Sequence, residues 1–295
     1  MKATLLIAIR LVALSVLYFI CFSVVSAALL ATPSEPSAQV QAGATLIALL
    51  VISLLNTLVL GFIILRSRWA GWKLILAIFF VFYGVTTVMS QIETAFFVTR
   101  LPPGMLPRLF LSGAIIAAVF SSLAVVILGK GRSNPTESNN QSRLNMPISQ
   151  WVAKLLLIVI AYLVIYFSFG YFIAWKSAAV RAYYGGSDPG NFLAQMSSVV
   201  RDSPWLVPLQ AGRALLWTAL AAPVIQMMKG EWWETGLAVA LLFAVVNSQL
   251  LLPNPFMPQE VRMVHLLETA TSNFLFGWLI VLILRGWRQS ASESA

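Results

Sequence analysis

The sequence has few charged residues and few of the side chains that bind metals or form disulfides. Only 10% of its 295 residues are charged, whereas a soluble domain carries about 25%, which excludes an ordinary water-soluble fold. One cysteine, Cys21, excludes an intrachain disulfide and a cysteine-based metal site. One histidine, His265, leaves any zinc site dependent on carboxylates and offers haem a single axial ligand. We therefore expect no metal and no cofactor.

Long apolar runs fill most of the chain, and 59% of its residues are hydrophobic. A membrane-spanning helix needs about 20 mostly apolar residues. Eight stretches meet this need: 5–30, 44–65, 72–97, 107–129, 151–175, 205–228, 233–252 and 265–286. Their apolar residues are continuous and do not alternate as in a membrane barrel. The sequence predicts an all-α polytopic membrane helix bundle with about eight transmembrane helices.

Lysine and arginine gather at alternate ends of the predicted helices, and cytoplasmic loops are where membrane proteins carry this excess. The residues that show it are Lys2, Arg66, Arg68, Lys73, Lys130, Arg132, Arg143, Lys154, Lys229, Arg285 and Arg288. Both termini are therefore predicted to be cytoplasmic. These loops account for the net charge of +9, so the bilayer is the expected partner and nucleic acid is not. The short loops favour a bacterial inner membrane.

A polar stretch at 130–150 predicts a flexible cytoplasmic linker between two four-helix halves, 1–129 and 151–286. Within the first half, 1–30 is either a retained helix that acts as a signal anchor or a cleavable signal peptide. The Ser-rich tail, 287–295, is predicted to be disordered.

The outer loop, 176–204, contains a candidate amphipathic helix. Asp188 followed by Pro189 is typical of a helix start. A helix from there would place Phe192, Leu193, Met196, Val199 and Val200 on one face. Such a helix would lie on the outer membrane surface or over the mouth of the bundle. An irregular loop is the alternative.

Four ionisable side chains interrupt the apolar stretches near the predicted non-cytoplasmic side: Glu93, Arg213, His265 and Glu268. A charge in hydrocarbon costs at least about 2.5–3.5 kcal/mol, and a guanidinium cannot neutralise itself. Arg213 lies about eight residues, or about 12 Å at 1.5 Å per residue, inward of Trp205 at the start of its span. We therefore predict that Glu93 or Glu268 faces Arg213 inside the bundle.

Further polar residues at compatible depth extend these four into a predicted outward-facing pocket. They are Tyr83, Ser90, Gln91, Gln210, Asn247, Gln249 and Ser272. His265 and Glu268 are three residues apart and should share a helix face. Tyr83, Thr86, Ser90 and Glu93 should form a second polar stripe, at three- and four-residue spacing. An interhelical clamp that only fixes packing is the alternative to a pocket.

Small residues recur every four positions in two stripes, Gly113/Ala117/Ser121 and Gly236/Ala240/Ala244/Ser248. This spacing lets helix backbones approach closely in lipid, either within the chain or with a partner protein or second copy. Three functions remain open on this sequence. The first is binding or transport of a small molecule, proton or lipid headgroup in the polar pocket. The others are a non-catalytic subunit of a membrane complex and an outer-leaflet lipid-modifying enzyme.

Overall fold

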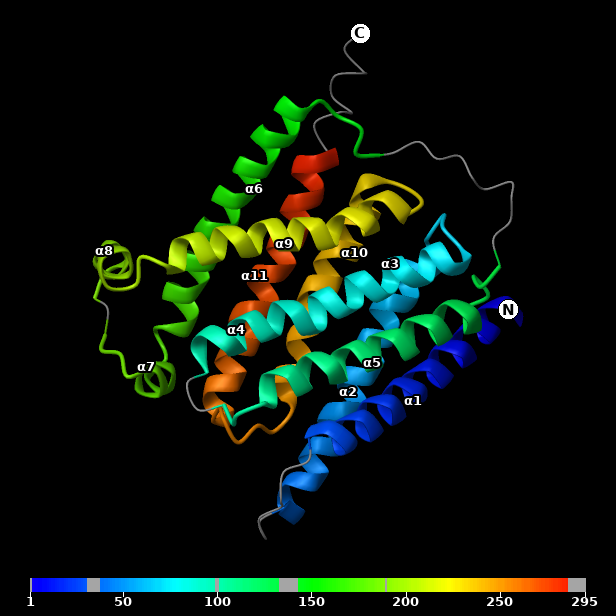
Figure 1. Cartoon of the computed structure of the whole chain (residues 1–295), viewed down its shortest axis with the longest axis horizontal. Helices are drawn as coiled ribbons and strands as arrows, with labels where there is room; N and C mark the ends of the chain where they lie inside the picture. The colour runs from blue at the N-terminus through cyan, green and yellow to red at the C-terminus, as the bar shows by residue number, and fades with distance from the viewer. Residues whose placement is uncertain (1, 31–37, 99–100, 133–142, 189, 286–295) are drawn as a thin grey trace. The chain divides into compact units, whose positions relative to one another are not determined.

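The computed structural model describes residues 2–30, 38–98, 101–132, 143–188 and 190–285, and these residues form helices without a sheet (Figure 1). Within these ranges, seven helical segments are long and apolar enough to cross a membrane. The predicted all-α membrane helix bundle is therefore confirmed, and the orientation of the termini stays a prediction. The predicted tail, Pro189 and the middle of the predicted linker, 133–142, lie outside the described residues.

The chain forms two compact units. Unit 1 consists of Met1–Gln141 with the short segments Gln226–Gly230 and Leu251–Phe256. Its helical elements are α1 (Lys2–Leu30), α2 (Ala38–Leu65), α3 (Gly71–Tyr83), the π-helical turn η1 (Gly84–Val88), α4 (Met89–Phe97) and α5 (Met105–Ile127).

Aromatic and small side chains hold unit 1 together. The ring of Tyr18 on α1 packs against Phe82 of α3 and Phe120 of α5, with centroids 6.0 and 5.1 Å away. Gly113 of α5 has no room for a Cβ beside the side chain of Thr87. The first small-residue stripe thus packs inside the chain at Gly113, and Ala117 and Ser121 are buried.

Unit 2 consists of Ser142–Ile225, Glu231–Leu250 and Met257–Ala295. Its elements are α6 (Ile148–Phe169), the π-helical turn η3 (Gly170–Ala174), α7 (Ala178–Tyr184), α8 (Phe192–Asp202), most of α9 (Leu206–Met227), α10 (Trp232–Val245), most of the 3-10 turn η4 (Val246–Leu251) and α11 (Gln259–Arg285). Helix α11 packs against α10 and α6 (Figure 1).

The α10–α11 contact depends on two glycines. A Cβ on Gly277 would lie 2.7 Å from the Cα of Ala240, and one on Gly236 would lie 2.5 Å from the ring of Trp278. Close backbone approach at small residues is the favoured packing of helices in lipid. The second small-residue stripe therefore packs against α11 of the same chain at Gly236 and Ala240.

The structure differs from the predicted spans in the hydropathy of one helix and in the starts of two others. The stretch predicted at 205–228 forms α9, which is not one of the seven apolar segments because Gln210, Arg213 and Gln226 reduce its hydropathy. Helix α11 begins at Gln259, six residues before the predicted start, directly after Pro258. Helix α8 begins at Phe192, and its cap is Asn191, whose Oδ1 accepts from the Ala194 amide at 2.8 Å. Asp188 instead accepts from the Gly190 amide.

The predicted polar stripe on the third span is interrupted by η1. In this turn the Met89 amide donates to the Gly84 carbonyl, five residues back, so the turn holds one residue more than an α-helix. Residues beyond it are rotated by about 100°, the angle per helical residue. Ser90 and Glu93 therefore do not continue the face of Tyr83 as a regular helix would require.

Candidate functional site

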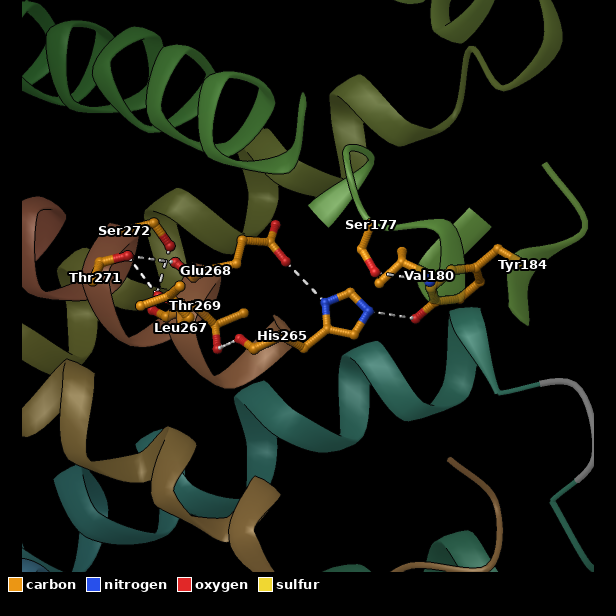
Figure 2. A network of polar contacts seen from close by, with 9 residues as sticks. All are labelled: Ser177, Val180, Tyr184, His265, Leu267, Glu268, Thr269, Thr271 and Ser272. Carbon is orange, nitrogen blue, oxygen red and sulfur yellow. Dashed lines mark hydrogen bonds and ion pairs between the residues drawn. The ribbon is translucent and has the colours of Figure 1, made fainter. Parts of the chain in front are cut away.

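An acidic residue and the single histidine meet near the start of α11. The Nδ1 atom of His265 lies 2.8 Å from Oε2 of Glu268, one helical turn further on (Figure 2). Their side chains are 18% and 11% exposed. Residues three apart share a helix face, so the sequence spacing alone brings this pair together.

Tyr184, at the end of α7, contacts the other side of the imidazole. Its hydroxyl lies 3.3 Å from Nε2 of His265, and the two rings meet edge to face with centroids 5.8 Å apart (Figure 2). The sequence analysis did not identify Tyr184, because its position depends on how a short loop helix packs against α11.

Local hydrogen bonds fix α7 where Tyr184 can reach His265. Ser177 caps the helix by accepting from the Val180 amide, as Figure 2 shows. The guanidinium of Arg181 donates to the carbonyls of Trp175 and Lys176 at 2.7 and 3.1 Å, which ties α7 to the end of η3. Gly185, with φ of +70°, then ends the helix in a conformation that favours glycine.

The second carboxylate oxygen of Glu268 lies beside η3. A Cβ on Gly170 would be 3.7 Å from Oε1, so the backbone of this turn borders the carboxylate. π-Helical turns occur frequently at functional sites. The outer level of the site thus consists of Glu268, His265 and Tyr184 against η3.

The hydrogen bonds define how the imidazole handles a proton. When the Glu268 carboxylate is ionised it only accepts, and Nδ1 of His265 then carries the hydrogen that Glu268 binds. In the neutral ring Nε2 is then the acceptor for the Tyr184 hydroxyl. Protonation at Nε2 leaves the contact with Glu268 intact. The outer level can therefore take up and release a proton without breaking the pair.

Because His265 is the only histidine, ¹⁵N spectra of histidine-labelled protein report on this ring alone. In alkaline solution, where imidazole is neutral, we expect the Nδ1–H tautomer in the native protein. In Glu268→Ala the ring loses its acceptor and should shift to the Nε2–H form that free histidine prefers. Tyr184→Phe, which keeps Glu268, should retain Nδ1–H. An Nε2–H signal in the native protein would contradict the assigned geometry.

A second polar level lies on α9. Oε1 of Gln210 accepts from Nη1 of Arg213 at 2.8 Å and from the Tyr162 hydroxyl of α6 at 3.4 Å. Gln210 is fully buried and Arg213 is 5% exposed. The predicted residues Gln210 and Arg213 thus meet as one-turn neighbours, and Tyr162 is an additional member that the sequence analysis missed.

The packing of α6 against α11 relates the two levels. Tyr162 packs on Phe276 of α11 with ring centroids 4.7 Å apart, while Gly170 borders Glu268. Tyr162 and Gly170 are eight residues apart along the chain, and so are Glu268 and Phe276. Eight residues of helix span about 12 Å at 1.5 Å per residue. The Gln210–Arg213 level therefore lies about two turns deeper than the outer level, on helices of the same unit.

Of the remaining predicted residues of unit 2, Asn247 and Ser272 bond to backbone carbonyls three or four residues back. The Asn247 amide donates to the carbonyls of Phe243 and Ala244, and the Ser272 hydroxyl donates to that of Thr269 (Figure 2). Gln249 is partly buried in η4. These three residues occupy the predicted helices, but the contacts described here do not join them to either polar level.

The other predicted residues belong to unit 1. Tyr83 stacks on Phe79 with centroids 5.7 Å apart, and the Ser90 carbonyl accepts from the Thr94 hydroxyl. Oε1 of Gln91 is buried without a hydrogen-bond partner among the described residues. Glu93 is half-buried on α4. A pairing of Arg213 with Glu93 or with Glu268 stays a prediction.

Across the described ranges, no three His, Cys, Asp or Glu side chains are grouped so that they could hold a metal ion. What the residues do offer is a titratable pair and a buried cation with its amide partner. The chain matches no protein-family model, no curated protein and no solved structure.

Proposed function

We propose that this multi-pass membrane protein binds a small anionic solute together with a proton in unit 2 and carries them across the bilayer. The observation behind the proposal is the pair of polar levels, His265–Glu268 near the start of α11 and Gln210–Arg213 about two turns deeper. Both levels lie on long helices whose other residues are mostly apolar.

The deeper level contains two buried donors that make no hydrogen bond within the described part of the chain. The guanidinium of Arg213 is permanently charged, and Oε1 of Gln210 already accepts from two groups. Nε2 of Gln210 is buried and makes no hydrogen bond within the described part of the chain, and the same holds for Nε1 of Trp217, four residues beyond Arg213. Carboxylate or phosphate oxygens are the acceptors that such donors bind best, which supports an anionic solute.

The outer level supplies the proton. Moving a bare anion through hydrocarbon is costly, and joint movement of a proton removes one unit of its negative charge. Imidazole is the side chain whose charge changes most readily near neutral pH, and Nε2 of His265 points toward an exposed tyrosine hydroxyl. A proton accepted there and an anion held near Arg213 are the two components of a coupled carrier.

Proteoliposomes loaded with the pH-sensitive dye pyranine test this function. Lactate, succinate, phosphate and sulfate are added outside, each in turn. We expect at least one of them to acidify the lumen about tenfold faster than in protein-free liposomes, and Arg213→Gln to return that rate to the protein-free level, since losing one buried charge pair is worth at least a factor of ten.

The matched control is Arg108→Gln, which makes the same substitution at an exposed arginine in the first turn of α5. That variant should keep the native rate. The proposal is wrong if none of the four anions moves protons faster than the lipid alone. It is also wrong if Arg213→Gln, eluting as a single folded species, transports as well as the native protein.

A further inference from the structure

Helix α8, between the end of α6 and the start of α9, has three distinct faces. One face packs on the protein, with Gln195 buried and Phe192, Met196 and Val199 partly buried. A second face is polar and exposed, with Ser197, Arg201 and Asp202. The third carries Leu193 and Val200, which are seven residues apart and therefore lie on the same side, two turns apart.

These two apolar side chains are unusually open. Leu193 is 74% exposed and Val200 is 63% exposed, although the adjacent face of the same helix packs against protein. A helix at the edge of a bilayer contacts protein on one face, water on a second and lipid on a third. The three faces of α8 fit this position.

The start of α8 is held at the end of a predicted membrane span. The ring of Phe192 stacks on Phe172 with centroids 6.0 Å apart and planes within 6° of parallel, and it meets Tyr171 edge to face at 5.4 Å. Phe172 is in the last turn of the Ile148–Ala174 segment and is 63% exposed, as a lipid-facing side chain would be. The exposed apolar surface of α6 thus continues onto α8.

We infer that α8 lies in the membrane interface, with Leu193 and Val200 inserted among the lipids of the leaflet that surrounds the end of α6. The charges on the helix allow it to bind uncharged lipid. Nε of Arg201 lies 3.7 Å from Oδ1 of Asp202, so the polar face carries one cation and one anion side by side. Insertion is therefore driven by apolar burial and is independent of anionic headgroups.

Environment-sensitive labelling of the full chain tests this assignment. The only native cysteine is replaced by Cys21→Ser, and Leu193→Cys or Asp202→Cys, on the opposite side of the helix, then takes an NBD fluorophore. In phosphatidylcholine vesicles, lipids with a nitroxide on the acyl chain close to the headgroup should quench the label at 193 about twofold more than the label at 202. The label at 193 should also emit at shorter wavelength. Val200→Cys should behave like Leu193→Cys.

Other outcomes would overturn the inference in different ways. Weak quenching that is equal at 193 and 202 would place α8 in water. A blue-shifted label at 193 that nitroxide lipids fail to quench would place this face against protein, as a cover over the bundle or a contact with a second copy. Quenching at 193 that appears only after phosphatidylglycerol is added would mean that charge, and not apolar burial, brings α8 to the membrane. None of these readouts depends on transport.

Discussion

Gly277→Ala is expected to destabilise unit 2 by about 1–3 kcal/mol, the usual cost of adding a methyl group where there is no space. The new Cβ would lie 2.7 Å from the Cα of Ala240 and 2.9 Å from its amide nitrogen. These are backbone atoms, which cannot move aside as a side chain can. Helices α10 and α11 would have to separate, and α11 carries His265 and Glu268. The loss should be measured by unfolding in a dodecyl maltoside–SDS titration.

Gly212→Ala is the matched control for this substitution. Gly212 is an exposed glycine of α9, and no atom lies within 4 Å of the Cβ that alanine would add. Alanine in a helix is more favourable than glycine by about 0.5–1 kcal/mol, so this variant should be as stable as the native protein or slightly more stable. If both alanines had the same effect, the close α10–α11 approach would be wrong.

Trp217→Ala is expected to cost about 3–5 kcal/mol, because it empties the site of a fully buried indole. Trp217 is 1% exposed and packs on Phe243 of α10 with ring centroids 4.3 Å apart. The same SDS titration measures the effect. A loss below about 1 kcal/mol would mean that the ring does not fill the interface between α9 and α10.

Trp217→Phe separates packing from hydrogen bonding. It keeps a ring against Phe243 but removes Nε1, a buried donor without a hydrogen-bond partner in the part of the chain that the structure describes. Stability should therefore change by less than about 1.5 kcal/mol. If the indole donates to the solute, anion-driven proton uptake should fall about tenfold, the value of one lost hydrogen bond of 1.4 kcal/mol. Unchanged uptake would remove Trp217 from the solute site.

The fold class could be predicted because it depends on the number and length of the apolar runs. Runs of about 20 apolar residues can satisfy their backbone groups in a membrane only as helices or closed barrels. Contacts within one helix were also predictable, since three-residue spacing alone places His265 beside Glu268 and Gln210 beside Arg213. Even there, the sequence could not say that Gln210 would be the amide that accepts from Arg213.

Contacts between helices were beyond sequence reasoning. Tyr162 and Tyr184 complete the two polar levels, yet nothing in one sequence fixes how far α6 slides along α11 or how α7 is turned. The four-residue spacing of Tyr162 and Tyr166 was a usable signal for a polar face on α6. The prediction of a continuous polar stripe from Tyr83 to Glu93 was wrong for another reason. Periodicity arguments assume an uninterrupted α-helix, and the π-helical turn η1 interrupts this one.

The corresponding turn in α6 has a consequence for any chain that is one residue shorter there. Without the extra residue of Gly170–Ala174, the segment would wind as ordinary α-helix. It would still be long enough to cross a bilayer, but everything after it would leave the span rotated by about 100°. Tyr184 would then be directed away from the imidazole. A single-codon deletion would therefore preserve the architecture and separate Tyr184 from His265 and Glu268. The site thus depends on the length of this segment as well as on its composition.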